Sequence, residues 1–455
     1  MSNQERIVLV LLSIVYVFMG RYTEHPDMQT LGIMGCFGLF QFIYGIYVWI
    51  RKGNQFLSPY IIFLLALYIF SFGQSFLWAF GIDPERSLIG FQRITIAEVF
   101  DAQVRTLLML AFFQIGASFA SSKTNFNDRT SVDKSNKLKQ VGWALFAVSI
   151  IPYSVETYRN MVISMTSGYA ALYEGTARIG VSNWASILAD YCIPSLICLF
   201  IAYRHNRLVR RSITLFFLLN IIAILITGGR TFAVILLALL VVLYNYLVKK
   251  FTKKWLLIGC LGGFCFLQIL SYVAEVRVDS NRSLSVSSVE LESNGAIDAI
   301  AEMGSSMFCL IKTTNLVPET TDFRYGKSYL YAFTSLIPNL GFWDIHPAKR
   351  EANLSHWLTN SLGLDYGTGF SMCAEAYANF GDFGFIIFFF WGLFIAHIFG
   401  KIEISVIEKD YSMLAFLLIL FWFCLTLPRN NFINLVRPLF FIAGPVYLYC
   451  AKFKG

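Results

Sequence analysis

The sequence predicts an all-α protein that crosses a membrane about twelve times, and two observations support this fold class. Apolar residues make up 56% of the chain and charged residues only 14%, whereas charged residues form about 25% of an ordinary soluble domain. Apolar runs long enough to span a bilayer, which takes about 17–25 residues in a helix, follow one another along the chain. Neither the alternation typical of β-barrels nor an internal repeat is present.

The apolar runs place the expected transmembrane helices along the chain. The first run, Ile7–Met19, is not followed by a small-residue cleavage site, so we expect it to be retained as a helix. The expected spans are residues 5–20, 31–50, 57–80, 104–120, 141–160, 187–203, 213–227, 231–248, 255–274, 384–400, 413–428 and 437–451. The resulting organisation is a transmembrane bundle at 1–274, a polar loop at 275–383 and a second transmembrane bundle at 384–455.

Basic residues are distributed unequally between alternate loops. One set of loops contains Arg51, Lys52 and the lysines between residues 249 and 254, whereas each short loop of the other set holds only one or two arginines. Because cytoplasmic loops collect Lys and Arg, this bias places both termini in the cytoplasm and the 275–383 loop outside. The same rule explains most of the net charge of +8, so nucleic acid is not expected as a partner.

The loop between residues 275 and 383 is too long to serve only as a connection. Apolar residues at helical spacing predict an amphipathic helix over Gly295–Thr313, either on the membrane surface or packed over the bundle end. Aromatic residues follow this helix, and their side chains suit both sugar stacking and the bilayer interface. Cys309 and Cys373 also lie in the loop, either as free thiols or as a disulfide.

Arginines at the expected outer ends of helices form the first candidate site. Arg230 follows two glycines in a tight turn, and Arg429 and Arg437 bracket the last outer loop. An arginine at the membrane surface is costly unless an anion or a partner compensates its charge, and guanidinium groups grip a diphosphate through forked hydrogen bonds. Arg277 and Arg324 add positive charge to the same side. The alternative role of these arginines is ordinary anchoring at the interface.

A second group of polar residues leads into the expected span at 384–400. Glu375, Tyr377 and Asn379 lie at the mouth of this helix. A partly desolvated carboxylate there can act as a general base, although a carboxylate also stabilises a helix N-terminus. His346, further upstream, is a second candidate base. No Cys/His cluster, phosphate-binding loop or hydrolase signature is present, so neither a metal nor a cofactor is expected.

Together these features resemble those of bacterial O-antigen and polysaccharide repeat-unit polymerases, the Wzy family. The resemblance extends along nearly the whole chain and depends on the order and spacing of the features. They are Gly228-Gly229-Arg230 between two closely spaced helices, the long outer loop with Ser335–Asn339, the Glu-Ala-Tyr-x-Asn-Phe-Gly run at Glu375–Gly381, and the arginine pair around the last outer loop.

The resemblance implies a metal-independent glycosyltransferase of the GT-C type in the inner membrane. Undecaprenyl-diphosphate-linked oligosaccharides would be donor and acceptor, and the product would be the polysaccharide of a lipopolysaccharide, a capsule or an exopolysaccharide. The arginines would stabilise the leaving diphosphate, and Glu375 or His346 would deprotonate the attacking hydroxyl. Tyr377 and Asn379 would contact the substrate. A chain-length regulator and a flippase are the protein partners that the resemblance suggests.

Two other functions remain as alternatives. An O-antigen ligase shares the architecture but transfers sugar to a different lipid, with a loop histidine as base. A transporter of polysaccharide or lipid-linked oligosaccharide would place ionisable residues near mid-membrane. Here Glu156 and Asp190 are the nearest cases, and the twofold repeat of many carriers is missing. We therefore favour the polymerase.

Overall fold

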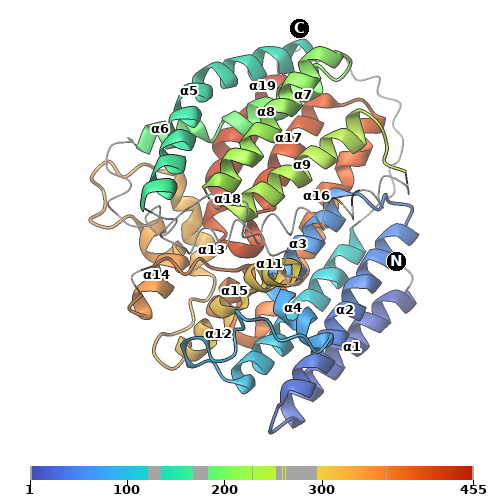
Figure 1. Ribbon diagram of the computed structural model, residues 1–455, viewed down its shortest axis with the longest axis vertical. Coiled ribbons are helices and arrows are strands. Elements are labelled where there is room, and N and C mark those ends of the chain that lie inside the picture. Colours follow the sequence, from blue (N-terminus) through green and yellow to red (C-terminus); the bar gives the residue numbers. More distant parts are fainter. Residues whose placement is uncertain are drawn as a thin grey trace, which may run out of the picture. The chain divides into compact units, whose positions relative to one another are not determined.

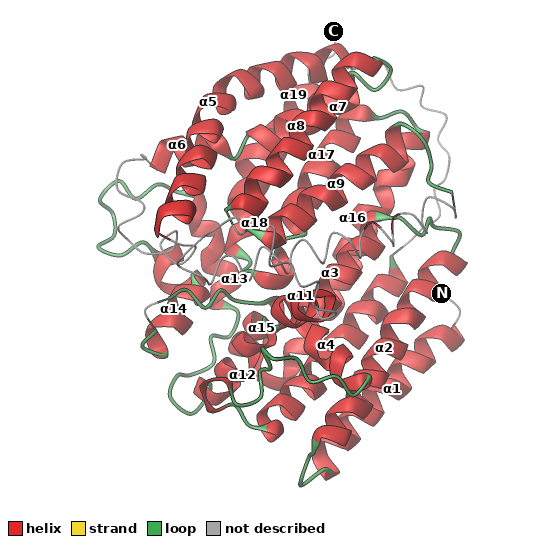
Figure 2. Ribbon diagram, viewed as in Figure 1, coloured by secondary structure: helices red, strands yellow, loops and turns green. Residues whose placement is uncertain are grey.

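The computed structural model of the protein describes residues 3–120, 135–167, 183–227, 229–252, 295–364 and 366–452, together with Gly259 and Gly262. No strand occurs in these ranges, and the helices are joined by turns and loops (Figure 2). Contacts group the chain into two compact units. The first comprises Met1–Asn125, Ile300–Gly400 and Cys424–Arg437, and the second comprises Phe126–Ala299, Lys401–Phe423 and Pro438–Gly455. The division expected at residues 275 and 383 is of a different kind, because it separates membrane-spanning segments from an outer loop. That division stays a prediction.

The first unit contains the N-terminal helices and the short helices of the expected outer loop (Figure 1). Its α-helices, wholly or for at least half of their length, are α1 (Asn3–Tyr22), α2 (Met28–Arg51), α3 (Pro59–Ala79), α4 (Ile96–Phe119), α11 (Gly295–Gly304), α12 (Met307–Leu316), α13 (Lys327–Ala332), α14 (Leu354–Ser361), α15 (Met372–Phe380), α16 (Gly384–Ile407) and α18 (Ile433–Pro438). Its other helical turns are η1 (Phe91–Arg93), η5 (Phe333–Leu336), η6 (Ala348–Ala352), η7 (Gly381–Phe383) and η8 (Leu427–Arg429).

The second unit contains the middle of the chain and the C-terminal helices. Its helices are α5 (Ser135–Ser167), α6 (Asn183–Ala189), α7 (Cys192–Ala202), α8 (Arg207–Ile226), α9 (Arg230–Leu247), α17 (Tyr411–Cys424), η9 (Leu439–Ala443) and α19 (Gly444–Lys452). Within this unit α5 packs along α7 and also contacts α6 and α8, and α8 packs against α9.

Polar side chains cap the helices of the first unit where their sequences change from loop to apolar run. Asp27 and Thr30 form a capping box at the start of α2, and Thr95 and Glu98 form one at the start of α4. Ser58 caps α3 and is followed by a proline in the first turn. These groups bond the backbone N–H groups that a helix start leaves without partners, so the helix starts are encoded locally.

Glycines allow α4 and α16 to approach one another closely. A Cβ added to Gly116 would lie 1.9 Å from the carbonyl oxygen of Phe389, and one added to Gly392 would lie 1.8 Å from that of Phe113. Helices in a membrane associate through such small residues because lipid is as apolar as their side chains. Since only the short turn η7 separates α16 from α15, this crossing also helps to hold the segment that carries Glu375.

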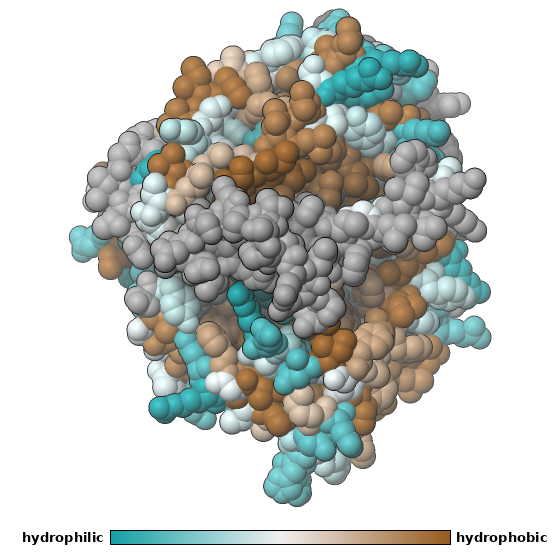
Figure 3. Space-filling model, in the orientation of Figure 1, coloured by the Kyte–Doolittle hydropathy of each residue, from teal (hydrophilic) through white to brown (hydrophobic). Residues whose placement is uncertain are grey.

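Eight helical segments in the described ranges are long and apolar enough to cross a membrane. They are Met28–Arg51, Pro59–Ala79, Ser135–Ser167, Ala185–Ala202, Arg207–Ile226, Met372–Ile407, Tyr411–Arg429 and Ile433–Cys450, and Thr231–Leu247 is a shorter apolar helix. Many large apolar side chains of these segments are exposed, and Figure 3 shows apolar residues in brown over much of the described surface. The spans expected at 5–20 and 104–120 correspond to α1 and α4, and the span expected at 255–274 falls almost entirely outside the described residues.

The single amphipathic helix expected over Gly295–Thr313 is wrong in its continuity, because the chain forms α11 and α12 with a break between them. A Cβ at Gly304 would lie 2.5 Å from the backbone nitrogen of Gln74, so α11 ends in close contact with α3. The hydroxyls of Ser305 and Ser306, which follow, donate to carbonyl groups of the preceding turn. α12 is largely buried and packs against α4 and α15, which favours packing over the bundle rather than a position on the membrane surface.

The two loop cysteines are free and buried. The Cys309 thiol donates to the carbonyl of Thr368 over 3.6 Å, and the Cys373 thiol donates to the hydroxyl of Ser71 over 3.6 Å. Each thiol thus has its own partner, and the disulfide alternative is not adopted.

Candidate functional site

Glu375 is the most strongly connected of the predicted site residues. It lies in the first turn of α15, which begins after the capping residue Ser371, and it is only 2% exposed. Its Oε1 accepts a hydrogen bond from the Ser328 hydroxyl at 2.7 Å, and its Oε2 accepts one from the backbone N–H of Phe432 at 2.7 Å. The carboxylate therefore connects α15 with α13 and with the loop between Arg429 and Arg437.

Asn379, one turn after Glu375, completes this network, because residues four apart share one face of a helix. Its amide nitrogen donates to the Ser328 hydroxyl at 2.8 Å and to the Glu375 carbonyl at 2.7 Å. Ser328, which is fully buried, thus accepts from Asn379 and donates to Glu375. Sequence reasoning missed Ser328, because a lone serine near the start of a short loop helix carries no motif.

Tyr377 belongs to a different cluster. Its hydroxyl donates to the carbonyl of Val317 at 3.4 Å. The Arg105 guanidinium lies 5.3 Å from the centre of its ring and forms ion pairs with Asp382 at 2.9 Å and Asp101 at 3.5 Å. Alternate residues of a helix point in different directions, which explains why Tyr377 is separated from the Glu375 network despite its place in the same motif.

Arg324 is held close to the Glu375 network. Its backbone N–H donates to the carbonyl of Ala378 at 2.9 Å. Its guanidinium pairs with the Glu351 carboxylate at 3.5 Å, and its side chain is 11% exposed. Burial lowers the pKa of Arg324, while the Glu351 and Glu375 carboxylates act in the opposite direction. The positive charge of Arg324 is therefore already compensated by acidic groups.

The segment 429–437, expected from the sequence to be the last outer loop, contains two predicted arginines with different surroundings. Arg429 ends η8, is half-buried and lies near α12, where its charge opposes the burial that raises the pKa of Cys309 to about 12. Arg437, in the last turn of α18, is exposed and has no hydrogen bond or ion pair with the described residues. The guanidinium of Arg437 thus remains available to a ligand.

Consecutive residues fasten this loop to the rest of the first unit. Asn431 is buried, and in the amide orientation that satisfies both of its polar atoms its side-chain carbonyl accepts from the backbone N–H groups of Leu354 at 2.9 Å and Ser355 at 3.2 Å, at the start of α14. The next residue, Phe432, makes the bond to Glu375. The loop between the two arginines is therefore attached to both α14 and α15.

His346, the second candidate base, is engaged within its own loop. Its Nδ1 accepts from the Ala348 backbone N–H at 3.2 Å, so its Nε2 carries the proton and donates to the carbonyl of Ile337 at 2.9 Å. Its ring also packs against that of Trp343 in a T-shaped arrangement. Both ring nitrogens thus stabilise the loop, and no contact joins His346 to Glu375 in the described part of the chain.

The two remaining predicted arginines do not belong to the described part of the first unit. Arg230 is the first residue of α9 in the second unit, immediately after the turn in which the Gly229 N–H donates to the Ile224 carbonyl at 2.9 Å. The short turn expected between these helices is thus present. Arg277 lies outside the described residues. Whether Arg230 and Arg277 join the same site stays a prediction.

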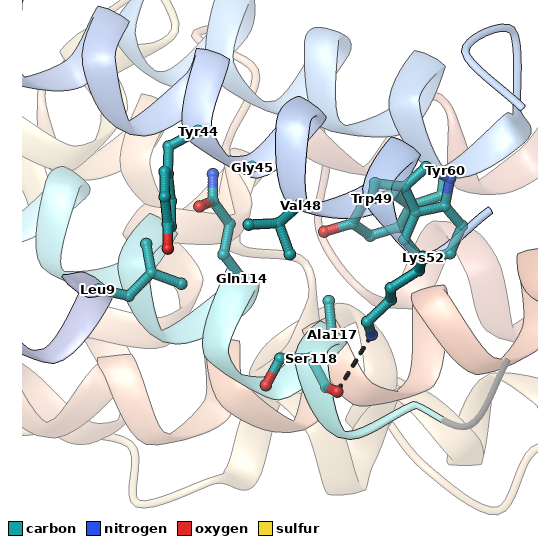
Figure 4. Close-up of a pocket in the computed structure, with 10 residues that line it drawn as sticks. All are labelled: Leu9, Tyr44, Gly45, Val48, Trp49, Lys52, Tyr60, Gln114, Ala117 and Ser118. Carbon is teal, nitrogen blue, oxygen red and sulfur yellow. Dashed lines mark hydrogen bonds between the residues drawn. The ribbon is translucent and has the colours of Figure 1, made fainter. Parts of the chain in front are cut away.

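Two cavities in the first unit contain none of the predicted site residues. The smaller, of about 20 Å³, lies among α1–α4, where Lys52 donates to the carbonyl of Ser118 (Figure 4). It has room for about one water molecule. The larger, of about 680 Å³, is an open, apolar groove on α1–α3. Within the described ranges, no three His, Cys, Asp or Glu side chains gather as metal ligands.

The all-helical fold with its many membrane-length segments defines a multi-pass membrane protein. The family described as O-antigen polysaccharide polymerase Wzy matches residues 6–454, and the chain belongs to this family. The resemblance found in the sequence is thereby confirmed, and with it a general role in O-antigen polymerisation from lipid-linked oligosaccharides in the membrane. No curated protein and no solved structure gives a significant match.

Proposed function

We propose that the protein joins oligosaccharide repeats carried on undecaprenyl diphosphate at the outer face of the bacterial inner membrane. A hydroxyl of the incoming carrier-linked repeat attacks the anomeric carbon of the reducing-end sugar of the growing chain. The bond between that carbon and the diphosphate oxygen breaks, undecaprenyl diphosphate leaves, and the hydroxyl proton passes to a base. The chain grows by one repeat and is now held by the incoming carrier.

The contact between Glu375 and Phe432 is the observation that carries this proposal. Phe432 stands between Arg429 and Arg437 in the sequence, and its N–H lies 2.7 Å from the carboxylate oxygen. One hydrogen bond thus connects a candidate base with the loop that bears two candidate diphosphate ligands. Glycosyl transfer from a diphosphate carrier requires both functions, namely proton removal from the acceptor and stabilisation of the leaving group.

In this proposal the arginines hold the diphosphate. Arg437 has its guanidinium free of described partners, and Arg429 lies on the same loop. A guanidinium binds two phosphate oxygens at once through parallel N–H groups, which suits the charge that develops on the leaving diphosphate. Arg230 and Arg277 are proposed to complete the site from the remainder of the chain.

Glu375 is proposed as the base that accepts the hydroxyl proton. Because the carboxylate is only 2% exposed and its Oε1 is bonded to Ser328, the acceptor hydroxyl would replace the Ser328 hydroxyl as the donor to Oε1. Asn379 holds Ser328 in place, and Tyr377 is proposed to contact sugar from its own cluster. His346 would first have to leave its two backbone partners, so it is the second candidate.

Glycan analysis of a strain lacking the protein tests this function. We expect single repeat units on the final acceptor, with polymer restored by the wild-type chain. A ligase would instead leave finished polymer on the carrier lipid, and a transporter would leave unflipped lipid-linked repeats at the cytoplasmic face. A chain-length regulator and a flippase are the proposed partners, and their loss should change the length or the supply of polymer without producing this pattern.

A further inference from the structure

A compact cluster of charged and aromatic residues lies beside the Glu375 network in the first unit. The guanidinium carbon of Arg324 lies 5.1 Å from the centre of the Trp357 ring in α14. The same guanidinium donates to the carbonyl of Glu351 at 3.2 Å and pairs with its carboxylate at 3.5 Å. The loop helices η6 and α14 thus bring an ion pair against an aromatic face, and none of these contacts is needed for the chemistry proposed above.

The ion pairs of this cluster are shared. The Glu351 carboxylate pairs with Arg324 and also with Arg350, at 3.0 Å. The Glu375 carboxylate also acts on Arg324, so the charge of Arg324 is opposed by acidic groups on two sides. A diphosphate is attracted by uncompensated positive charge, which Arg437 offers and Arg324 does not. The cluster is better suited to a neutral ligand with many hydroxyl groups, because its charged groups supply both donors and acceptors.

Trp357 and Tyr325 supply aromatic surface with unused polar groups. Trp357 is partly exposed, and its indole N–H has no hydrogen-bond partner among the described residues. Tyr325, next to Arg324, is 74% exposed, and its hydroxyl is likewise without a described partner. An aromatic ring with a polar end can stack on the apolar face of a sugar and bond its hydroxyls.

The backbone of Tyr325 is held in a conformation that a tyrosine rarely adopts. Its φ is +47°, in the left-handed region, and Gly326 follows with a φ of +82°. Bulky side chains are uncommon there, whereas glycine is accommodated readily. The N–H of Tyr325 donates to the carbonyl of Asn379 at 3.0 Å, which fixes this turn to the end of α15. A strained backbone therefore presents a large aromatic ring to the outside, beside the helix of Glu375.

We propose that Arg324, Glu351, Trp357 and Tyr325 form a saccharide-binding subsite that is distinct from the diphosphate-binding arginines. This inference rests on the proposed polymerase function and assigns the recognition of the repeat unit to the segment between α13 and α14. Trp357 and Tyr325 stack on sugar rings, while Arg324 and Glu351 exchange hydrogen bonds with their hydroxyls. Strained, exposed residues are found at ligand-binding sites, where the strain is maintained by surrounding contacts.

Inhibition of the purified full-length protein by two probes tests the subsite. One probe is the free repeat-unit oligosaccharide, released from its carrier, and the other is inorganic pyrophosphate. We expect Trp357→Ala to weaken inhibition by the oligosaccharide roughly 2- to 10-fold, the effect of losing one aromatic contact, with inhibition by pyrophosphate unchanged. Arg437→Ala should show the reverse pattern.

Tyr325 offers a variant that separates binding from folding. Tyr325→Gly relieves the left-handed backbone and should leave the unfolding temperature unchanged or higher, yet weaken oligosaccharide inhibition, while Tyr325→Phe should retain most of it. Phe342→Ala, which removes a loop aromatic that is 70% exposed, is the matched control and should behave like the wild type.

If the Trp357→Ala and Tyr325→Gly proteins are stable and the oligosaccharide inhibits them as it inhibits the wild type, the subsite proposal is overturned. Polymerisation by the wild type would in that case leave the proposed function intact. Equal weakening of inhibition by the oligosaccharide and by pyrophosphate would also overturn the subsite proposal, because the cluster would then affect binding of both ligands. Failure of the wild type to polymerise would instead contradict the proposed function.

Discussion

The backbone N–H of Phe432 donates to the Oε2 atom of Glu375 over 2.7 Å, although 57 residues separate the two in sequence. This bond ties the buried carboxylate of α15 to the loop between Arg429 and Arg437. The other carboxylate oxygen is bonded to Ser328. A substitution at Glu375 or Ser328 should therefore affect the loop that is proposed to hold the diphosphate.

Ser328→Ala should lower stability. The substitution removes the donor to Oε1 of a buried carboxylate and the acceptor of the Asn379 amide, and leaving buried polar groups without partners costs about 1–3 kcal/mol. Thermal unfolding in detergent should show a reduced midpoint. Ser355→Ala is the control, because among the described residues its hydroxyl bonds Asn353, two residues earlier. An equal shift in both proteins would argue against a special role for Ser328.

Arg437→Ala should reduce polymerisation without reducing the amount of protein in the membrane. A hydrogen bond to a charged group contributes about 1.5–3 kcal/mol, which corresponds to a roughly 10- to 150-fold loss at about 1.4 kcal/mol per decade. Arg437→Lys should recover only part of the activity, because an ammonium group cannot fork across two oxygens. Complete recovery by lysine would show that only charge matters at this position.

Cysteine labelling tests the membrane topology, in a variant from which native reactive cysteines are removed. We expect a cysteine at Ser287 to react with an impermeant reagent from outside and one at Ser135 to react only after the membrane is opened. Arg204 bonds the Ser135 hydroxyl, so a second position in the same loop, Lys134, serves as a check. The reverse pattern would invert the orientation derived from the distribution of basic residues.

Polymerisation by the purified protein should survive chelation. In the proposed reaction the guanidinium groups stabilise the leaving diphosphate, a role that other glycosyltransferases give to a divalent cation. Activity should be equal before and after treatment with EDTA. A loss that added Mg²⁺ or Mn²⁺ restores would refute the arginine-based account.

The sequence predicted the helices better than it predicted the breaks between them. Long apolar runs and capping residues such as Asp27 and Thr95 are local signals, so α2, α3 and α4 follow from them. The break between α11 and α12 depends on the contact of Gly304 with the backbone of α3, which joins residues far apart in the chain. No local pattern encodes such a contact, and the helix was expected to continue.

In the candidate site, too, contacts between residues far apart in the chain were not predicted. The motif at Glu375–Gly381 identified Glu375 and Asn379, which share one face of α15 and one network. It also suggested Tyr377, which lies in a separate cluster with Arg105. Ser328 and Phe432 could not be predicted, because one is a lone serine and the other contributes only its backbone. Arg324 was expected to attract an anion, but its partner Glu351 comes from another segment of the loop.

Replacement of Glu375 tests the central claim most directly, since glutamine and alanine separate its two roles. Glutamine is isosteric, so it can still accept from Phe432 and donate to Ser328 but cannot take a proton from a sugar hydroxyl, whereas alanine loses the attachment of the loop as well. The measurement is polymer formation by purified protein from carrier-linked repeats, with unfolding temperature recorded alongside. The account predicts that Glu375→Gln keeps a near-normal unfolding temperature and loses polymerisation at least 100-fold (a general base typically contributes about 10²–10⁴-fold), and that Glu375→Ala loses both. Polymerisation by Glu375→Gln close to the wild-type rate would show that the carboxylate only holds the loop, and would contradict its role as the base.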